Sequence, residues 1–267
     1  MEKIYRLHYR AQFKESYTEK ELTQAVEECK QNIRKLQEDG RMLTAALYRH
    51  DKMLFLYYEA FGQAIEVMEP IALTSQTGSQ IKSVSQDGMN TDGTAELIME
   101  SGEDVQTTAV HPTEFLAPLA SYLCVWPGQQ TDRLWVHMYY IYCHNIPESR
   151  EHWKRAAVPE MRRGRIAFLR DEKLFGYVYY HKAIVDEGLL QGDKYQSIAL
   201  HENILFSYFE EPKTFVNMQN SQEESKVIED WIAVDPESHF IHMPQGGGEN
   251  FMFLPALFAM GVEDFAE

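Results

Sequence analysis

The chain has 267 residues, of which 44% are hydrophobic and 25% charged, the composition of a globular protein that needs no disulfide bonds to stabilise its core. Its formal net charge of −16 argues against a nucleic-acid backbone or an anionic membrane as the main partner, because like charges repel. The N-terminus lacks the apolar segment of a signal peptide and no stretch is apolar enough to span a membrane, so we expect a cytoplasmic protein.

The first half of the chain predicts the order strand, helix, strand, strand. Residues 3–13, KIYRLHYRAQF, alternate bulky and polar side chains as a strand does. Thr18 and Glu21 form a capping box before a helix with one apolar stripe, and Gly40 ends this helix. MLTAALYR and MLFLYYEA then predict two strands joined by a tight turn at residues 50–52.

The second half predicts a similar order. Residues 132–143, DRLWVHMYYIYC, indicate a strand, and Asn145 and Glu148 indicate the start of a helix that ends near Gly164. IAFLR and KLFGYVYYH predict two strands around a turn at residues 171–172, and residues 194–210 predict a further helix.

Two sequence echoes favour an internal duplication. RHDKMLFLYYE (residues 49–59) is echoed by RDEKLFGYVYYH (residues 170–181), and AVHPTEF (residues 109–115) by AVDPESHF (residues 233–240). We therefore predict an α+β fold of two ferredoxin-like βαββαβ repeats, residues 1–130 and 131–267, whose sheets face each other as an internal pseudo-dimer of the dimeric α/β-barrel type.

A polar segment at about residues 74–108 departs from this scheme. It is rich in Ser, Thr, Gln and Gly and contains no Phe, Trp or Tyr. A surface insertion is the simpler interpretation, and a short hairpin lid over the site is the alternative.

Strand parity suggests a pocket between the two sheets, where titratable and aromatic side chains of both halves would meet. The predicted catalytic residues are His8, Glu59, His137 and His181, and the predicted substrate-binding residues are Arg6, Tyr57, Trp135, Tyr139 and Tyr179. Imidazole and carboxylate groups are suited to proton transfer near neutral pH, and aromatic walls suit a sugar-like ring. Alternatively, each of these side chains only packs in the core and has no part in catalysis or binding.

Other chemistries find little support in the sequence. Cys29, Cys124 and Cys143 are far apart and indicate reduced thiols, and no histidine has the spacing of a metal site. Nucleotide-binding and nucleophile-elbow motifs are absent, and GGGEN (residues 246–250) indicates a flexible turn. We therefore expect no metal and no cofactor.

The hairpin sequences ALYRHDKMLFLYYEA and AFLRDEKLFGYVYYHKA resemble the β-hairpin of the L-rhamnose mutarotases, and VPEM (residues 158–161) resembles the helical WPEL of that family. The resemblance implies a ferredoxin-like fold with a pocket inside the barrel, and interconversion of sugar anomers without a cofactor. It does not extend to the histidine five residues before the proline of the motif. Lys154 occupies that place, and His152 lies nearby.

Three functions therefore stay open at this point. The first is a small-molecule enzyme that transfers a proton on a sugar-like substrate. The second is a non-enzymatic protein that binds a small ligand or another protein, and the third is a haem-binding barrel. The oligomeric state does not follow from the sequence.

Overall fold

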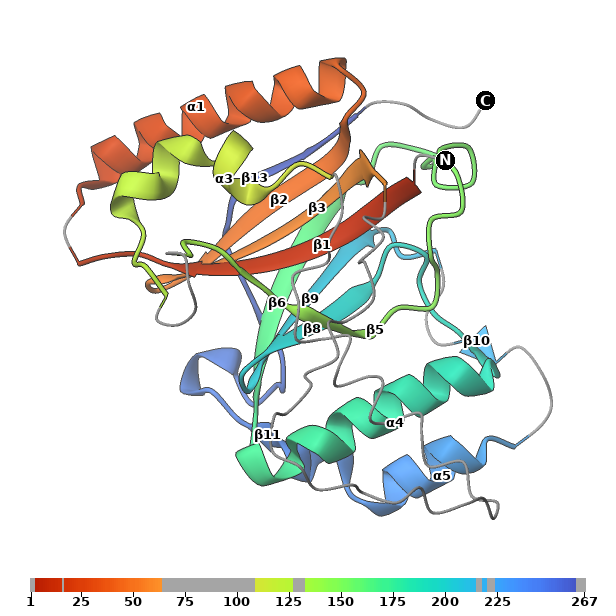
Figure 1. Ribbon diagram of the computed structural model, residues 1–267. Coiled ribbons are helices and arrows are strands. Elements are labelled where there is room, and N and C mark those ends of the chain that lie inside the picture. Colours follow the sequence, from red (N-terminus) through yellow and green to blue (C-terminus); the bar gives the residue numbers. More distant parts are fainter. Residues whose placement is uncertain are drawn as a thin grey trace, which may run out of the picture.

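The computed structural model describes residues 3–15, 17–63, 109–126, 133–214, 218–219 and 224–262. The molecule has four layers, with two sheets packed face to face and helices on both outer sides (Figure 1). Helices α1 (Glu19–Glu38) and α3 (Pro112–Phe115) cover the first sheet, and helices α4 (Leu174–Glu187) and α5 (Lys226–Ala233) cover the second. The predicted insertion at residues 74–108 lies outside the described residues.

The first sheet has the strand order β13-β2-β3-β1-β4. Its strands are β1 (Lys3–Gln12), β2 (Met42–His50), β3 (Met53–Gly62), β4 (Val136–His137) and β13 (Ala256–Gly261). The predicted strand, helix and hairpin of the first half are confirmed. Thr18 and Glu21 form the predicted capping box, and the apolar stripe of α1 is buried on the sheet.

The second sheet has the strand order β11-β6-β9-β8-β5, and β12 pairs with another part of β6. Its strands are β5 (Tyr139–Tyr142), β6 (Met161–Leu169), β8 (Ser197–His201), β9 (Ile204–Glu211), β11 (Phe240–Ile241) and β12 (Met252–Phe253). Two short strands, β7 (Leu190–Gln191) and β10 (Met218–Gln219), pair with each other. The 3-10 turns are η1 (Ala117–Tyr122), η2 (Asp171–Lys173), η3 (Pro236–His239) and η4 (Pro244–Gly246).

Both sheets contain the antiparallel order of a βαββαβ unit. The strands β4-β1-β3-β2 follow this order in the first sheet, and β11-β6-β9-β8 follow it in the second. In addition, each sheet contains one strand that follows the other unit in the chain. Strand β5 follows β4 directly in the chain but pairs with β8, and the C-terminal β13 returns to pair with β2.

Most of the predicted elements of the second half are wrong. Residues 145–160 form no helix. The predicted strand at residues 173–181 lies in helix α4 from Leu174 onwards. The predicted helix at residues 194–210 is mainly the hairpin of β8 and β9. In α4, Tyr177 and Ile184 lie seven residues apart on one buried face, so the helical period prevails over the apparent alternation. The motif VPEM, predicted as helical, consists of three loop residues and Met161, the first residue of β6.

The structural counterpart of the first hairpin is therefore the β8–β9 hairpin. Both have two-residue turns whose first residue has a positive φ, 49° at Asp51 and 55° at Glu202. The echo between residues 49–59 and 170–181 joins a hairpin to a helix, and so does not mark equivalent places. The other echo does occupy comparable crossovers, where α3 and η3 each begin at a proline.

Aromatic side chains fill the space between the two sheets. The rings of Tyr57 and Tyr208 stack at 3.7 Å, and those of Phe55 and Phe206 lie 5.4 Å apart. Both pairs join the central strands β3 and β9, and all four side chains are fully buried. The predicted face-to-face packing of two sheets is thus present.

Candidate functional site

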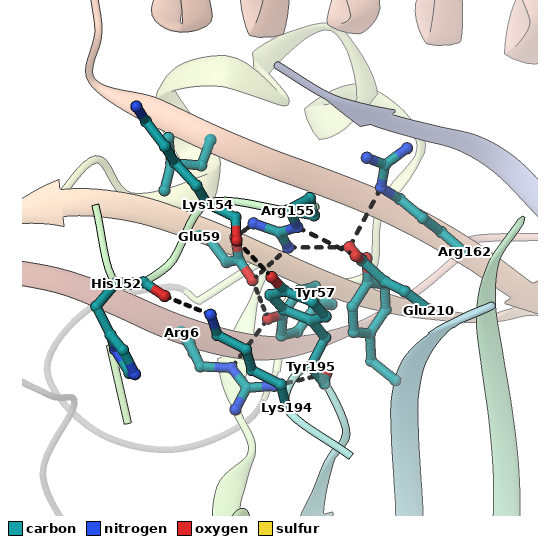
Figure 2. Close-up of polar contacts among 12 residues, drawn as sticks. Arg6, Tyr57, Glu59, His152, Lys154, Arg155, Arg162, Lys194, Tyr195 and Glu210 are labelled. Atoms are coloured by element: carbon teal, nitrogen blue, oxygen red, sulfur yellow. Dashed lines mark hydrogen bonds and ion pairs between the residues drawn. The ribbon is translucent and has the colours of Figure 1, made fainter. Parts of the chain in front are cut away.

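A buried ion cluster lies between the two sheets, with Arg155 at its centre (Figure 2). The Arg155 guanidinium, from the loop between β5 and β6, donates to Glu59 on β3 at 2.8 and 2.9 Å. It also donates to Glu210 on β9 at 2.9 and 3.1 Å. The two carboxylate side chains are 0% and 3% exposed, so one arginine joins the central strands of both sheets away from water.

The surroundings of the two carboxylates are nearly symmetric. Tyr57 donates from its hydroxyl to Glu59 at 2.6 Å, and Tyr208 donates to Glu210 at 2.8 Å. In both strands the tyrosine lies two residues before the glutamate, so both side chains point to the same face. The inner faces of the sheets therefore contribute matching Tyr–Glu pairs that share Arg155, and Glu210 also forms an ion pair with Arg162 Nε at 3.4 Å (Figure 2).

This cluster holds Glu59 as an ionised and fully bonded carboxylate. Burial acts to raise the pKa of Glu59, but the Arg155 charge and its hydrogen bonds outweigh burial and, with help from Arg6 and Tyr57, lower the pKa to about 2. A carboxylate with such a low pKa is a poor proton acceptor near neutral pH. The contacts of Glu59 therefore favour a structural role over the predicted catalytic one.

Arg6 and His8 reach the same interior from β1. Arg6 donates to the Tyr57 hydroxyl at 3.0 Å and to the backbone carbonyls of Asn145 and Tyr195. His8 is 0% exposed, with Nε2 lying 3.1 Å from the Ser197 hydroxyl, and burial lowers the pKa of His8 well below its usual value. His8 is therefore a neutral imidazole inside the packed interior.

The other predicted site residues lie elsewhere. His137 is opposite Tyr9 in the sheet, and Trp135 belongs to the core beneath α1, so both are on the helix side of the first sheet. Tyr139 is opposite Leu200, on the helix side of the second sheet. Tyr179 is 57% exposed on α4. Of the predicted site residues, only Arg6, His8, Tyr57 and Glu59 meet between the sheets.

His152 lies in the loop before β6, where its carbonyl accepts a hydrogen bond from Lys194 (Figure 2).

His181 lies at a second place, a cavity of about 370 Å³ between α4, α5 and the outer face of the second sheet. The cavity combines aromatic rings with a few polar groups, which is the usual composition of a small-molecule site. Its lining residues include Tyr142, Arg165, Tyr177, His181, Gln196, Ile228, Trp231 and Phe251.

The chemistry of His181 follows from its contacts. Its Nδ1 lies 3.0 Å from the Tyr177 carbonyl oxygen, which can only accept, so Nδ1 carries the proton and Nε2 offers a lone pair. The imidazole stacks on Tyr177 at 3.9 Å and meets the Trp231 ring edge-on at 5.4 Å. Burial is the main cause that lowers the pKa of His181 to about 4, so the ring is neutral at pH 7.

Sequence reasoning misses Arg155, Tyr208 and Glu210 in the cluster, although a signal for two of them exists. LFSYFEE (residues 205–211) repeats LFLYYEA (residues 54–60), with tyrosine and glutamate at the same two places. It also misses most of the lining of the cavity. The spacing of four between Tyr177 and His181 indicates a shared helix face once α4 is recognised as a helix.

Comparisons with known proteins define no family for this chain. No family matches the sequence, and no curated protein matches it. Two crystal structures are similar to it. One, from Fusobacterium nucleatum, is described as a "Putative monooxygenase"; it is 11% identical, has a TM-score of 0.37, and the match covers 98% of this chain and 96% of that one. The other, a "putative monooxygenase" from Lactobacillus acidophilus, is 6% identical with a TM-score of 0.39, and the match covers 97% and 96%.

These similarities are too low to transfer a ligand or a reaction, and neither concerns a mutarotase. Among the described residues, no group of three or more His, Cys, Asp or Glu side chains could hold a metal ion. No helix in the part of the chain that the structure describes is long and apolar enough to cross a membrane.

Proposed function

We propose that the chain binds a small, hydroxylated aromatic molecule in the cavity between α4, α5 and the second sheet. The cavity of about 370 Å³ carries this proposal, because aromatic rings surround a neutral imidazole whose Nε2 can accept a hydrogen bond. Flat rings gain both apolar burial and ring–ring contacts from such walls. The volume is near the lower end of ligand sites, which span roughly 300–1,000 Å³, and favours a one- or two-ring compound over haem.

His181 is suited to orient a hydroxyl group more than to remove its proton. The low pKa of about 4 makes the imidazole a weak base, whereas its lone pair still accepts a hydrogen bond. The function supported here is therefore specific binding, with His181 selecting a ligand that donates. The interior set around Glu59 is packed and paired, so it offers no comparable support for mutarotation of a sugar.

Binding is tested by titrating the protein with naphthol and with methoxynaphthalene, which has the same rings but no hydroxyl donor. Trp231 lines the cavity, so we expect naphthol to change tryptophan fluorescence and the Trp231→Phe variant to lose most of that change. Wild type should prefer naphthol roughly tenfold, the value of one good hydrogen bond. His181→Phe keeps a ring and should bind both compounds equally.

A matched pair of variants on α5 locates the site. Ile228 lines the cavity and Ile232, one turn later, is 64% exposed. Ile228→Trp should fill the cavity and abolish naphthol binding, whereas Ile232→Trp should leave it intact. Undiminished binding to a folded Ile228→Trp variant would contradict the proposal, as would failure of naphthol to bind wild type. Displacement of naphthol by glucose would support a sugar-like ligand instead.

We also infer that the two βαββαβ units arose by duplication. We therefore propose that the chain divides near residue 131. Their equal strand orders support it, as do the two Tyr–Glu pairs on β3 and β9. Superposing residues 3–62 on residues 161–211 tests it. The shared strands should align with Tyr57 on Tyr208, and any other register would count against a common origin.

A further inference from the structure

Arg165 lies where two hollows adjoin, and it forms no ion pair with the described residues. It lines the cavity of about 370 Å³ and also a neighbouring groove of about 640 Å³ formed with residues 245–253. Phe251 is the other residue that both share. The two hollows therefore adjoin at Arg165 and Phe251.

Arg165 makes few polar contacts with the described residues, so most of its guanidinium donors are available to a ligand. Among the described residues, Arg165 donates one long hydrogen bond of 3.5 Å, from Nε to the Ser207 hydroxyl, and it forms no ion pair. Its guanidinium otherwise lies over the Phe251 and Phe209 rings, 4.4 and 5.2 Å from their centroids. Burial lowers the pKa of Arg165, which reflects the cost of keeping this charge partly out of water.

A second cation lies beside it. The Lys213 ammonium is 4.4 Å from the centroid of the same Phe209 ring and, in the described part of the chain, forms no ion pair. Burial and the nearby Arg165 charge lower its pKa and outweigh the opposing effect of the Asp193 and Glu211 carboxylates. In a chain of net charge −16, two neighbouring cations that form no ion pair among the described residues favour an anion here, although Glu249 lines the groove and Asp193 and Glu211 lie near Lys213.

We propose that the ligand is an aromatic carboxylate, whose rings occupy the cavity and whose carboxylate pairs with Arg165 where the cavity and the groove adjoin. The planar guanidinium matches the two oxygens of a carboxylate, and a pair in a partly dry site is stronger than one in water. This inference rests on the proposed function, because it assigns an anionic group to the ligand of the same cavity.

Calorimetric titration with naphthoate and with naphthamide, its neutral isostere, tests the inference. Wild type should bind naphthoate at least about tenfold more tightly, as expected for a charge-assisted hydrogen bond. In Arg165→Gln the preference should fall to near unity, and Arg165→Lys should keep part of it. Arg163→Gln is the matched control, because Arg163 lies on the same strand, is paired with Glu211 and does not line the cavity.

The outcomes separate this inference from the proposed function. Equal binding of naphthoate and naphthamide to wild type overturns the anionic ligand and leaves the cavity proposal standing. Absence of binding by naphthol, naphthoate and naphthamide overturns both. Naphthyl phosphate binding more tightly than naphthoate would assign the cations to a phosphate and contradict a carboxylate. The wild-type ratio decides the matter even if Arg165→Gln unfolds.

Discussion

Glu59 and His181 are both buried titratable side chains, and their partners give them opposite roles. Glu59 is ionised because Arg155 outweighs the cost of burial. His181 is neutral because its partner is a carbonyl rather than a charge, so burial dominates. The residue type alone predicts neither outcome, since both depend on which group lies within hydrogen-bond distance.

Acid should destabilise the protein partly through Glu59. Its folded pKa of about 2 lies below its usual 4.5, so its contribution is fully present above pH 4.5 and is lost as pH falls towards 2. The difference corresponds to about 3 kcal/mol. Urea unfolding of wild type and Glu59→Gln between pH 7 and pH 3 should show a smaller acid loss in the variant.

The control for this effect is Glu27→Gln. Glu27 lies on the exposed side of α1, with half of its side chain in water. The free energy of unfolding of the Glu27→Gln variant should depend on pH as that of the wild type does. If that of Glu59→Gln also depends on pH as in the wild type, the Arg155 cluster does not hold the charge described for Glu59.

At the scale of elements, local signals predict the first half of the fold well. Helix α1 has a capping box and one buried stripe, and the β2–β3 hairpin has two alternating strands around a short turn. These features are complete within their own segments. Each therefore specifies its structure without information from distant residues.

Helix α4 and the β8–β9 hairpin show why the second half is harder to predict. LFGYVYYH alternates well enough for a strand, and only its packing on the second sheet selects the helix. Because α4 is apolar around most of its surface, its sequence has no clear polar face to reveal the helical period. Helix α4 forms part of the cavity wall. A strand predicted here therefore cannot bring the cavity residues together.

Gly164 on β6 shows how closely the two sheets approach. A Cβ placed there would lie 2.6 Å from the Tyr48 ring of the other sheet. We expect Gly164→Ala to cost about 1–3 kcal/mol of unfolding free energy, since neither neighbour can move without disturbing the inner core. Chemical denaturation measures this change.

A second substitution identifies the cause. Tyr48→Leu removes the ring that the new methyl group meets, so the double variant should recover part of the loss, with a coupling energy of roughly 0.5–3 kcal/mol. Strict additivity of the two changes would show that Gly164 is required for a reason other than Tyr48.

At the scale of the whole molecule, the exchange of strands makes the two sheets dependent on each other. Strand β13 comes from the end of the chain but completes the first sheet beside β2, and β5 completes the second beside β8. Arg155 then joins the central strands of both. We therefore expect that unfolding of either sheet would expose the aromatic inner face of the other and leave the Arg155 cluster incomplete.

Phe258 on β13 tests this dependence. It is 4% exposed in the core beneath α1, and Phe258→Ala should cost roughly 3–5 kcal/mol. Trp231 on α5, across the molecule, serves as the reporter in a background where the other tryptophans are replaced by Phe. If the molecule unfolds as one unit, the urea midpoint reported by Trp231 falls together with the far-ultraviolet circular dichroism midpoint.

The control is Phe253→Ala, at a side chain 53% exposed on β12, which should shift both midpoints much less. An unchanged Trp231 midpoint in Phe258→Ala would show that the second sheet is stable without the first, because the lost contacts lie wholly in the first.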